Sequence, residues 1–195
     1  MHSKATNLKL FSETPLLACV DIQKEYVTPG QRQVMADVDD VLNACVRVMN
    51  TWRKELWPIA HLKRMAPSTR FNSSNALTDW LETVRPCPGE LVFEHPMASA
   101  YSSPRFANYL RELGRSHIFI VGFSLEEAVL ATAVEGFHRG HNVSIISGAV
   151  ASRHSECCDA ALYRQVVLEL ISNYATLQAV DDILASVTSV YGGTP

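Results

Sequence analysis

The sequence predicts a three-layer α/β/α domain with a mostly parallel, roughly six-stranded, Rossmann-like sheet. Three observations lead to this fold class. Short apolar runs recur along the 195 residues, stretches with helical periodicity separate these runs, and no internal repeat or linker interrupts the alternation. Strands of a parallel sheet that is covered on both faces are apolar throughout, and helices connect them. We therefore expect one domain over residues 1–195, with a polar N-terminal extension at residues 1–14.

The predicted strands are short apolar runs bounded by polar or turn-forming residues. The first is LLACV at residues 16–20, and Asp21 directly follows it. Runs of this length between such boundaries favour a buried strand over a helix. The predicted strands cover residues 16–20, 57–62, 91–94, 117–121, 142–147 and 175–177.

The predicted helices are the stretches in which apolar residues recur every three or four positions. The clearest example carries Val38, Val41, Leu42, Cys45, Val48, Met49 and Trp52. This spacing places apolar side chains on one face of a helix, which can then cover the sheet. The helices are expected at residues 38–52, 104–113, 125–139, 155–171 and 180–187.

A long connection at residues 63–88 separates the second and third predicted strands. It is rich in Pro, Ser, Thr and Asn, and only a short helical stretch near residues 76–84 is expected in it. Connections of this length in compact domains are usually functional loops or lids. The connection also carries Arg64 and Arg70, whose positive charges could attract an anionic substrate.

Composition excludes several classes of protein. Hydrophobic residues make up 47% and charged residues 19% of the chain, which argues against a disordered protein. The net charge of −3 argues against nucleic-acid binding, which depends on clustered Lys and Arg. No apolar run approaches the roughly 20 residues that span a bilayer, so we expect no membrane association. Residues 1–14 lack the apolar stretch of a secretory signal, so a cytoplasmic protein is expected.

The chain has five cysteines, an odd number that favours reduced thiols over a disulfide framework. Cys19 and Cys45 fall in apolar segments, where cysteine behaves as a small hydrophobic residue. Cys157 and Cys158 fall within a predicted helix, where neighbouring side chains point in different directions. No sequence motif of metal ligands occurs, so we expect neither a metal nor a cofactor.

The expected site lies at one edge of the sheet. In open parallel sheets, ligands bind beyond the carboxyl ends of the strands. This rule selects the segments that follow the first, third and fourth predicted strands. They are residues 21–26, 95–101 and 122–128.

These three segments resemble motifs of the isochorismatase-like (cysteine hydrolase) superfamily. VDIQKEY at residues 20–26 is similar to the family's D-x-Q-x-x-[FY] opening. HPMASAY at residues 95–101 is similar to K-P-x-x-S-A-F, and GFSLEEAVLATA at residues 122–133 is similar to G-x-x-T-x-x-C-V-x-x-T-A. The three motifs occur in the family's order, and the resemblance covers almost the whole chain. It implies a hydrolase that acts on a small molecule.

The catalytic positions depart from the family pattern. The resemblance implies an Asp, Lys and Cys triad in amidase members, with a thiolate that attacks the amide carbonyl. Here Asp21 is kept, His95 stands at the lysine position and Ala128 stands at the position of the nucleophile. A methyl group cannot form a thioester. Cysteine-hydrolase chemistry is therefore excluded for this chain, unless Ala128 is an engineered substitution.

The same resemblance implies another chemistry. Isochorismatase members lack the cysteine and hydrolyse a vinyl ether, with the aspartate as general acid. By this comparison Asp21 and His95 are the expected catalytic residues. A desolvated pocket would have to raise the pKa of Asp21 for this role. The neighbouring Glu126 and Glu127 count against a strongly anionic substrate.

Further residues of the motifs are expected to bind the substrate. They are Gln23, Tyr26, Tyr101, Phe123, Ser124 and Glu127. A structural interpretation stands beside this one: Tyr26 and Tyr101 could belong to the core, and the S-x-x-E pattern of Ser124 and Glu127 is typical of a helix capping box. The resemblance also implies a cis peptide between Phe123 and Ser124, and a homodimer or homotetramer.

Three functional hypotheses remain open. In the first, the protein is a hydrolase that uses Asp21 and His95 on a small polar or cyclic substrate, without a cysteine nucleophile. In the second, it is an inactive relative that binds a small molecule or acts as an oligomeric scaffold. In the third, it is a cysteine-to-alanine variant of an amidase.

Overall fold

The computed structural model describes residues 14–31, 34–36, 38–67, 70–114 and 117–191, so the predicted N-terminal extension lies almost entirely outside the described residues. Its centre is a six-stranded sheet with the order β3-β2-β1-β4-β5-β6. Every neighbouring pair of these strands is parallel. The strands are β1 (Leu16–Val20), β2 (Ile59–Arg64), β3 (Leu91–His95), β4 (His117–Gly122), β5 (Asn142–Val150) and β6 (Thr176–Gln178).

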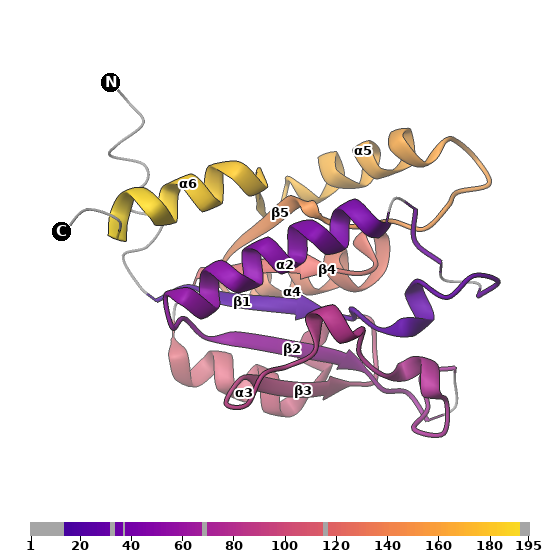
Figure 1. Ribbon diagram of the computed structural model, residues 1–195, viewed down its shortest axis with the longest axis horizontal. Helices are drawn as coiled ribbons and strands as arrows, with labels where there is room; N and C mark the ends of the chain where they lie inside the picture. The colour runs from indigo at the N-terminus through magenta and orange to yellow at the C-terminus, as the bar shows by residue number, and fades with distance from the viewer. Residues whose placement is uncertain (1–13, 32–33, 37, 68–69, 115–116, 192–195) are drawn as a thin grey trace.

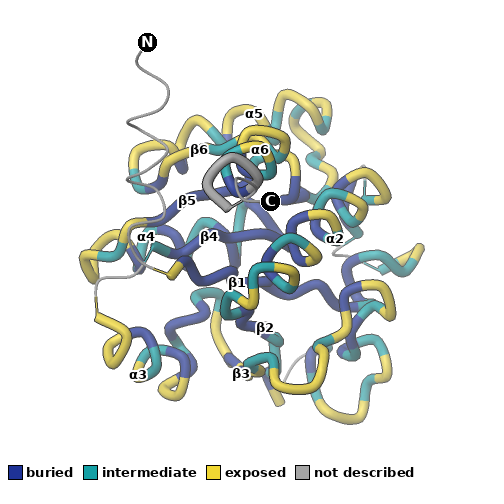
Figure 2. The backbone as a smooth tube through the Cα atoms, turned by 60° about the vertical axis from the view of Figure 1, so that its left-hand side comes forward, coloured by how far each residue is buried: buried dark blue, intermediate teal, exposed yellow. Residues whose placement is uncertain are grey.

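Helices cover both faces of this sheet (Figure 1). One apolar cluster joins the sheet to α2 (Val38–Lys54) and α6 (Val180–Tyr191). A second cluster joins the opposite face to α3 (Pro104–Leu113), α4 (Leu130–His138) and α5 (Ala160–Ile171). Figure 2 shows the strands largely buried between helices whose outer surfaces are exposed. The predicted three-layer α/β/α fold is therefore confirmed.

Strand β1 shows why its sequence forms a central strand. Successive side chains of a strand point to opposite faces. Leu17 and Cys19 pack in the cluster on the α2 side, whereas Leu16, Ala18 and Val20 pack in the cluster on the α4 side. Both faces are covered, so every residue of the strand is buried.

None of the described helices is long and apolar enough to cross a membrane.

Several element boundaries differ from the sequence prediction. The helix expected from residue 155 begins at Ala160, because the side chain of Asp159 accepts a hydrogen bond of 2.9 Å from the Leu162 amide and caps the helix there. Cys157 and Cys158 therefore lie in the loop before α5, and the expectation that they sit on a helix is wrong.

The predicted helix at residues 125–139 is divided in two. Its first part is the π-helical turn η5 (Leu125–Val129), and α4 follows it directly. The long connection holds the short 3-10 turns η2 (Ala76–Thr78) and η3 (Glu82–Val84) in place of one helix. Phe71 and Val84 of this connection are buried in the core on the α2 side.

The strand order places a topological switch point between β1 and β4. From β1 the chain proceeds to β2 and β3 on one side, and β4, β5 and β6 lie on the other. Ligand sites of such sheets lie at this point, beyond the carboxyl ends of the strands. Asp21 directly follows β1, and Phe123 directly follows β4. The fold thus brings two of the three motif segments together at the switch point.

Gly122 makes the close approach of β1 and β4 possible. Its φ of +118° lies in a region that favours glycine. A Cβ atom at this position would lie 2.0 Å from the carbonyl oxygen of Val20. The next residue, Phe123, donates its amide hydrogen to that same oxygen at 2.8 Å. Only glycine lets the end of β4 lie against β1 in this way.

Candidate functional site

Asp21 is held in an uncommon backbone conformation at the end of β1. Its φ is +51°, which aspartate adopts more readily than most residues. Non-glycine residues in this conformation are nevertheless uncommon, and they cluster at functional sites. The Asp21 amide donates to the Leu62 carbonyl at 2.9 Å, and the Asp21 carbonyl accepts from the Gln23 amide at 2.8 Å. The side chain is fully buried. The backbone thus fixes the direction of a buried carboxyl group.

His95 contacts this carboxyl group directly. It ends β3, is fully buried, and its Nε2 lies 2.7 Å from Oδ1 of Asp21. Its other ring nitrogen, Nδ1, lies 2.8 Å from the Met97 carbonyl oxygen. A carbonyl oxygen only accepts hydrogen bonds, so Nδ1 carries a hydrogen. One further proton must then lie between Nε2 and Oδ1, as an imidazolium beside a carboxylate or as a neutral imidazole beside a carboxylic acid.

The environment favours retention of this proton. Burial alone would lower the pKa of His95, but the Asp21 charge and the hydrogen bond to it outweigh burial and raise the pKa above its ordinary value. The Asp21–His95 contact therefore favours a pair that keeps its shared proton to higher pH than a free histidine would. Such a group suits general acid catalysis, which works best when the pKa lies near the working pH.

Tyr26 completes the contacts of the Asp21 carboxyl group. Its hydroxyl lies 3.3 Å from Oδ2 and donates to it. Burial, followed by the charge of Asp21, raises the pKa of Tyr26 well above its ordinary value, so the phenol keeps its hydrogen. The ring of Phe123 packs 5.9 Å from the ring of Tyr26, centroid to centroid. The predicted substrate-binding residue Tyr26 thus contacts the Asp21–His95 pair, and Phe123 packs against Tyr26.

Gln23 acts on the site through the backbone. Its amide nitrogen donates to the carbonyl oxygens of Thr78 at 2.6 Å and of Arg64 at 3.2 Å. Its amide oxygen accepts from the Arg64 amide at 2.8 Å. These bonds fix the end of β2 and the loop after it. In this arrangement the Gln23 side chain positions Arg64.

The turn η5 differs from the expected capping box. The carbonyl oxygen of Ser124 accepts from the amides of Glu127 at 3.2 Å and of Val129 at 3.1 Å, but its hydroxyl makes no capping hydrogen bond. The carboxylate of Glu127 instead lies 3.7 Å from Nη2 of Arg64. The capping-box interpretation is therefore wrong. The peptide between Phe123 and Ser124 is cis, as the resemblance implied.

Ala128 leaves the position of the nucleophile without a reactive group. It lies in η5, is 1% exposed, and packs in the apolar cluster on the α4 side. π-Helical turns of this kind are frequent at functional sites. In this turn a methyl group occupies the position at which the resemblance implies a thiol.

Tyr101 lies away from the pair. Its ring contacts Phe106, stacks on His141 and lies 4.8 Å from the guanidinium carbon of Arg139. Arg139 and His141 follow the last turn of α4, at the opposite end of that helix from Ala128. The structure thus shows Tyr101 in core and surface contacts rather than beside Asp21 and His95.

An open groove borders the site. It has a volume of about 610 Å³ and runs along η5 and α4. Leu130, Ala131 and Val134 contribute apolar lining, and Glu126 and Glu127 stand at the end nearest Ala128. Glu127 therefore faces both the groove and Arg64. The residues that line the groove include neither Asp21 nor His95.

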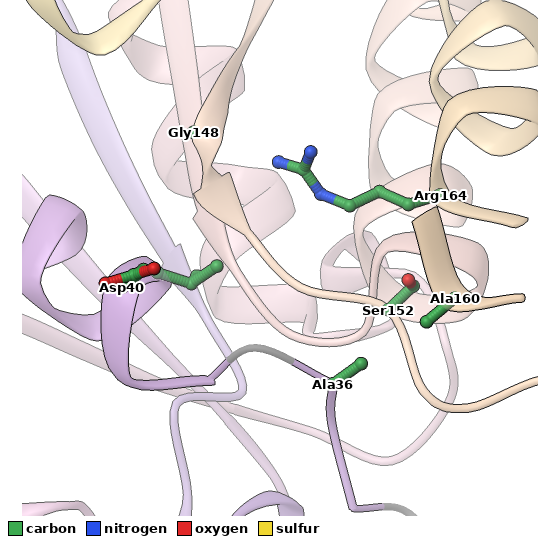
Figure 3. Close-up of a pocket in the computed structure, with 7 residues that line it drawn as sticks. Ala36, Asp40, Gly148, Ser152, Ala160 and Arg164 are labelled. Atoms are coloured by element: carbon green, nitrogen blue, oxygen red, sulfur yellow. The ribbon is translucent and has the colours of Figure 1, made fainter. Parts of the chain in front are cut away.

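A smaller cavity of about 170 Å³ lies between α2, β5 and α5 (Figure 3). Arg164 extends from α5 toward the strand that carries Gly148 and donates to the carbonyl oxygens of Ser147 and Val150. In this part of β5 the register with β4 shifts. Arg164 thus supplies donors where the strand ladder is interrupted, and the residues that line this cavity include neither Asp21 nor His95.

The neighbouring Arg64 could be inferred only in part from the sequence. It was one of two arginines in the long connection. The structure places Arg64 at the end of β2, in register with His95 of β3, whereas Arg70 pairs with the buried Glu25 at 3.3 Å. The sequence signal for Arg64 was a basic residue close to the carboxyl end of a predicted strand.

Among the described residues, no three His, Cys, Asp or Glu side chains form a group that could hold a metal ion.

Comparisons with known proteins identify the family of this chain. Residues 15–174 match the family described as the Isochorismatase domain. The chain is 24% identical over 175 residues to the secreted isochorismatase effector of Verticillium dahliae, covering 88% of this chain and 91% of that protein. It is also 24% identical over 169 residues to the maleamate amidohydrolase of Pseudomonas putida, covering 78% of this chain and 79% of that protein.

Solved structures share the fold. A cysteine hydrolase from Pseudomonas syringae pv. phaseolicola superposes with a TM-score of 0.84 at 15% identity, covering 91% of this chain and 94% of the other. An isochorismatase from Pseudomonas putida superposes with a TM-score of 0.79 at 22% identity, covering 86% and 89%.

Proposed function

The chain belongs to the isochorismatase family, and from this premise we propose that it hydrolyses a small polar or cyclic substrate by acid–base chemistry of Asp21 and His95. No cysteine nucleophile takes part in this reaction. One observation carries the proposal: the 2.7 Å contact between two fully buried groups that share a proton, next to a turn in which position 128 is alanine.

The pair supplies a complete proton cycle. For a vinyl ether, it gives its shared proton to the terminal alkene carbon, and water adds to the adjoining carbon that bears the ether oxygen. The added water then loses a proton, and the deprotonated pair accepts it, so the pair is restored. The resulting hemiketal breaks its bond to the ether oxygen while its hydroxyl proton passes to that oxygen, which releases an alcohol and a ketone. Tyr26 donates to the second carboxyl oxygen and keeps the group oriented. No bond between protein and substrate forms in this sequence.

The names of the two relatives suggest two kinds of bond that this chain could hydrolyse. One relative is named an isochorismatase and another an amidohydrolase. Amide hydrolysis in this family relies on a thiolate, whereas a vinyl ether needs a proton on carbon. A protonated pair without a thiol supports the second chemistry. We therefore place isochorismate first and maleamate second among test substrates.

The test measures turnover of both compounds before and after treatment with iodoacetamide. We expect isochorismate to be hydrolysed, and the rate to be unchanged by alkylation, because the exposed Cys87 and Cys157 take no part in the proposed chemistry. Mass spectrometry of the treated protein controls for alkylation of these thiols. Loss of activity on alkylation, or turnover of neither compound, would contradict the proposal.

A second candidate is an inactive relative that binds a small molecule or acts as an oligomeric scaffold. It is favoured by the burial of Ala128 in the core and by the change at two of the three expected catalytic positions. Absence of turnover together with ligand binding would support it. A third reading, an engineered loss of cysteine from an amidase, is decided by the natural gene sequence at codon 128.

We also propose a cellular compartment and an oligomeric state for this protein. All five cysteines are free, which supports a reducing compartment such as the cytoplasm. Leu162, Val166 and Leu170 form a half-exposed apolar stripe on α5, which supports assembly into a homodimer or homotetramer. The molar mass in solution, measured by light scattering, distinguishes these assemblies from a monomer.

A further inference from the structure

We propose that Arg64 makes this site selective for substrates that carry a carboxylate, with Glu127 as a counter-ion that the substrate displaces. The inference deepens the proposed function and rests on it, because it takes the Asp21–His95 pair as the reacting centre. It identifies a chemical class of substrate and the residue that selects it.

The backbone directs Arg64 to the same face of the sheet as His95. The two residues are partners in the parallel register of β2 and β3, so their side chains leave the sheet side by side. The preceding residue, Lys63, points to the other face, where its ammonium lies 5.8 Å from the ring of Trp80. Gln23 fixes the main chain of Arg64 through both its amide and its carbonyl.

The guanidinium group has unused donors. Its Nε is buried, and no described residue accepts a hydrogen bond from it. Its ion pair with Glu127 has a separation of 3.7 Å, which is longer than a hydrogen bond. The side chain as a whole is only 15% exposed. A planar guanidinium presents donors in a fork that matches a carboxylate, so the group is suited to bidentate binding.

The charges around the site leave this cation available. The Asp21–His95 pair is neutral as a whole when it shares one proton. Glu126 lies 3.2 Å from Nε of Arg153, and burial raises the pKa of its carboxyl group, so it opposes a substrate carboxylate less than an exposed glutamate would. Glu127 is 39% exposed and stands at the rim of the groove, where its carboxylate can return to water. A substrate carboxylate can therefore replace Glu127 beside Arg64 while the carboxylate of Glu127 remains solvated.

This arrangement alters the expectation drawn from the two glutamates. In the sequence, Glu126 and Glu127 counted against an anionic substrate. In the structure each faces an arginine, and Arg64 is the register partner of His95. Arg70 is not equivalent, since it is paired with the buried Glu25.

The test compares the binding of matched acids and amides by titration calorimetry at low ionic strength. The probes are benzoate with benzamide and crotonate with crotonamide. We expect the wild-type protein to bind each carboxylate at least about tenfold more tightly than its amide. Arg64→Gln should remove this preference, and Arg64→Lys should keep part of it. The control Arg111→Gln removes the same charge from the exposed surface of α3 and should leave the preference intact.

The role of Glu127 as counter-ion is tested by a substitution that should strengthen carboxylate binding. Glu127→Gln removes the competitor of the substrate carboxylate, so carboxylate binding should tighten severalfold while amide binding stays the same. This variant decides the matter even if Arg64→Gln does not fold. Three results would overturn the inference: no carboxylate preference in the wild type, a preference that survives in Arg64→Gln, or no binding of any probe up to about 10 mM. Because binding is read without turnover, failure here is distinct from failure of the proposed reaction.

Discussion

Replacement of Asp21 by asparagine is expected to lower kcat/KM by about 10²- to 10⁴-fold, the range typical of a lost general acid–base group. Asparagine keeps the size of the side chain and an acceptor for the Tyr26 hydroxyl, but it cannot exchange a proton with His95. Asparagine also tolerates the positive φ of this position. The loss should therefore appear in the rate and not in the fold.

The measurement is kcat/KM for isochorismate, with circular dichroism to verify folding. Asp39→Asn is the matched control, because it removes an exposed carboxylate from the first turn of α2. We expect the control to be as active as the wild type. Activity of Asp21→Asn close to that of Asp39→Asn would remove Asp21 from the reaction.

Replacement of Gly122 by alanine is expected to produce the largest loss of stability, about 3 kcal/mol or more. The added Cβ would lie 2.0 Å from the Val20 carbonyl oxygen, so β1 and β4 would have to separate at the centre of the sheet. The φ of +118° adds a conformational penalty for any residue with a Cβ. Because Phe123 bonds to the same oxygen, the site would be disturbed as well.

Gly114→Ala separates the two causes. Gly114 has a φ of +76°, but a Cβ there would meet no atom within 4 Å. We expect it to lose only about 1–3 kcal/mol, because its ψ of −144° combines with the positive φ to give a conformation that is almost exclusive to glycine. Urea denaturation of both variants gives the two free energies of unfolding. Equal losses would show that the contact with Val20 has no effect on stability.

Most of the fold follows from local patterns in the sequence. The apolar run at residues 16–20 is buried on both faces, and the periodic stretch from Val38 to Trp52 forms α2, because both patterns report directly which side chains leave water. The strand order and the registers were not predictable from such patterns. They depend on pairing between distant segments, such as Arg64 with His95.

The turn after β4 shows where local reasoning fails. The pattern of Ser124 and Glu127 suits a capping box, but in η5 the Ser124 carbonyl accepts two amides and Glu127 turns toward Arg64. The pattern itself does not distinguish these outcomes, since the choice depends on an arginine from another strand. The contacts of Tyr101 were not predictable for a related reason: its neighbours Arg139 and His141 are distant in sequence.

The candidate site was predictable as a location and less so as an arrangement. The rule for parallel sheets and the resemblance both selected Asp21 and His95. Their contact, and the Met97 carbonyl that fixes the histidine proton, required the structure. That carbonyl accepts the hydrogen on Nδ1, which leaves one shared proton between the two side chains.

The pH dependence of kcat/KM tests the role of this shared proton most directly. The pKa of His95 is raised, because the charge of Asp21 and the hydrogen bond to it outweigh the lowering effect of burial. The pair thus keeps its proton through the ordinary range of histidine, near pH 6.5, and loses it only at higher pH. We predict activity that is level through this range and falls as pH rises through the raised pKa, with the fall displaced in His95→Gln. Activity that rises with pH over the same range, as for a thiolate or a free base, would contradict acid catalysis by Asp21 and His95.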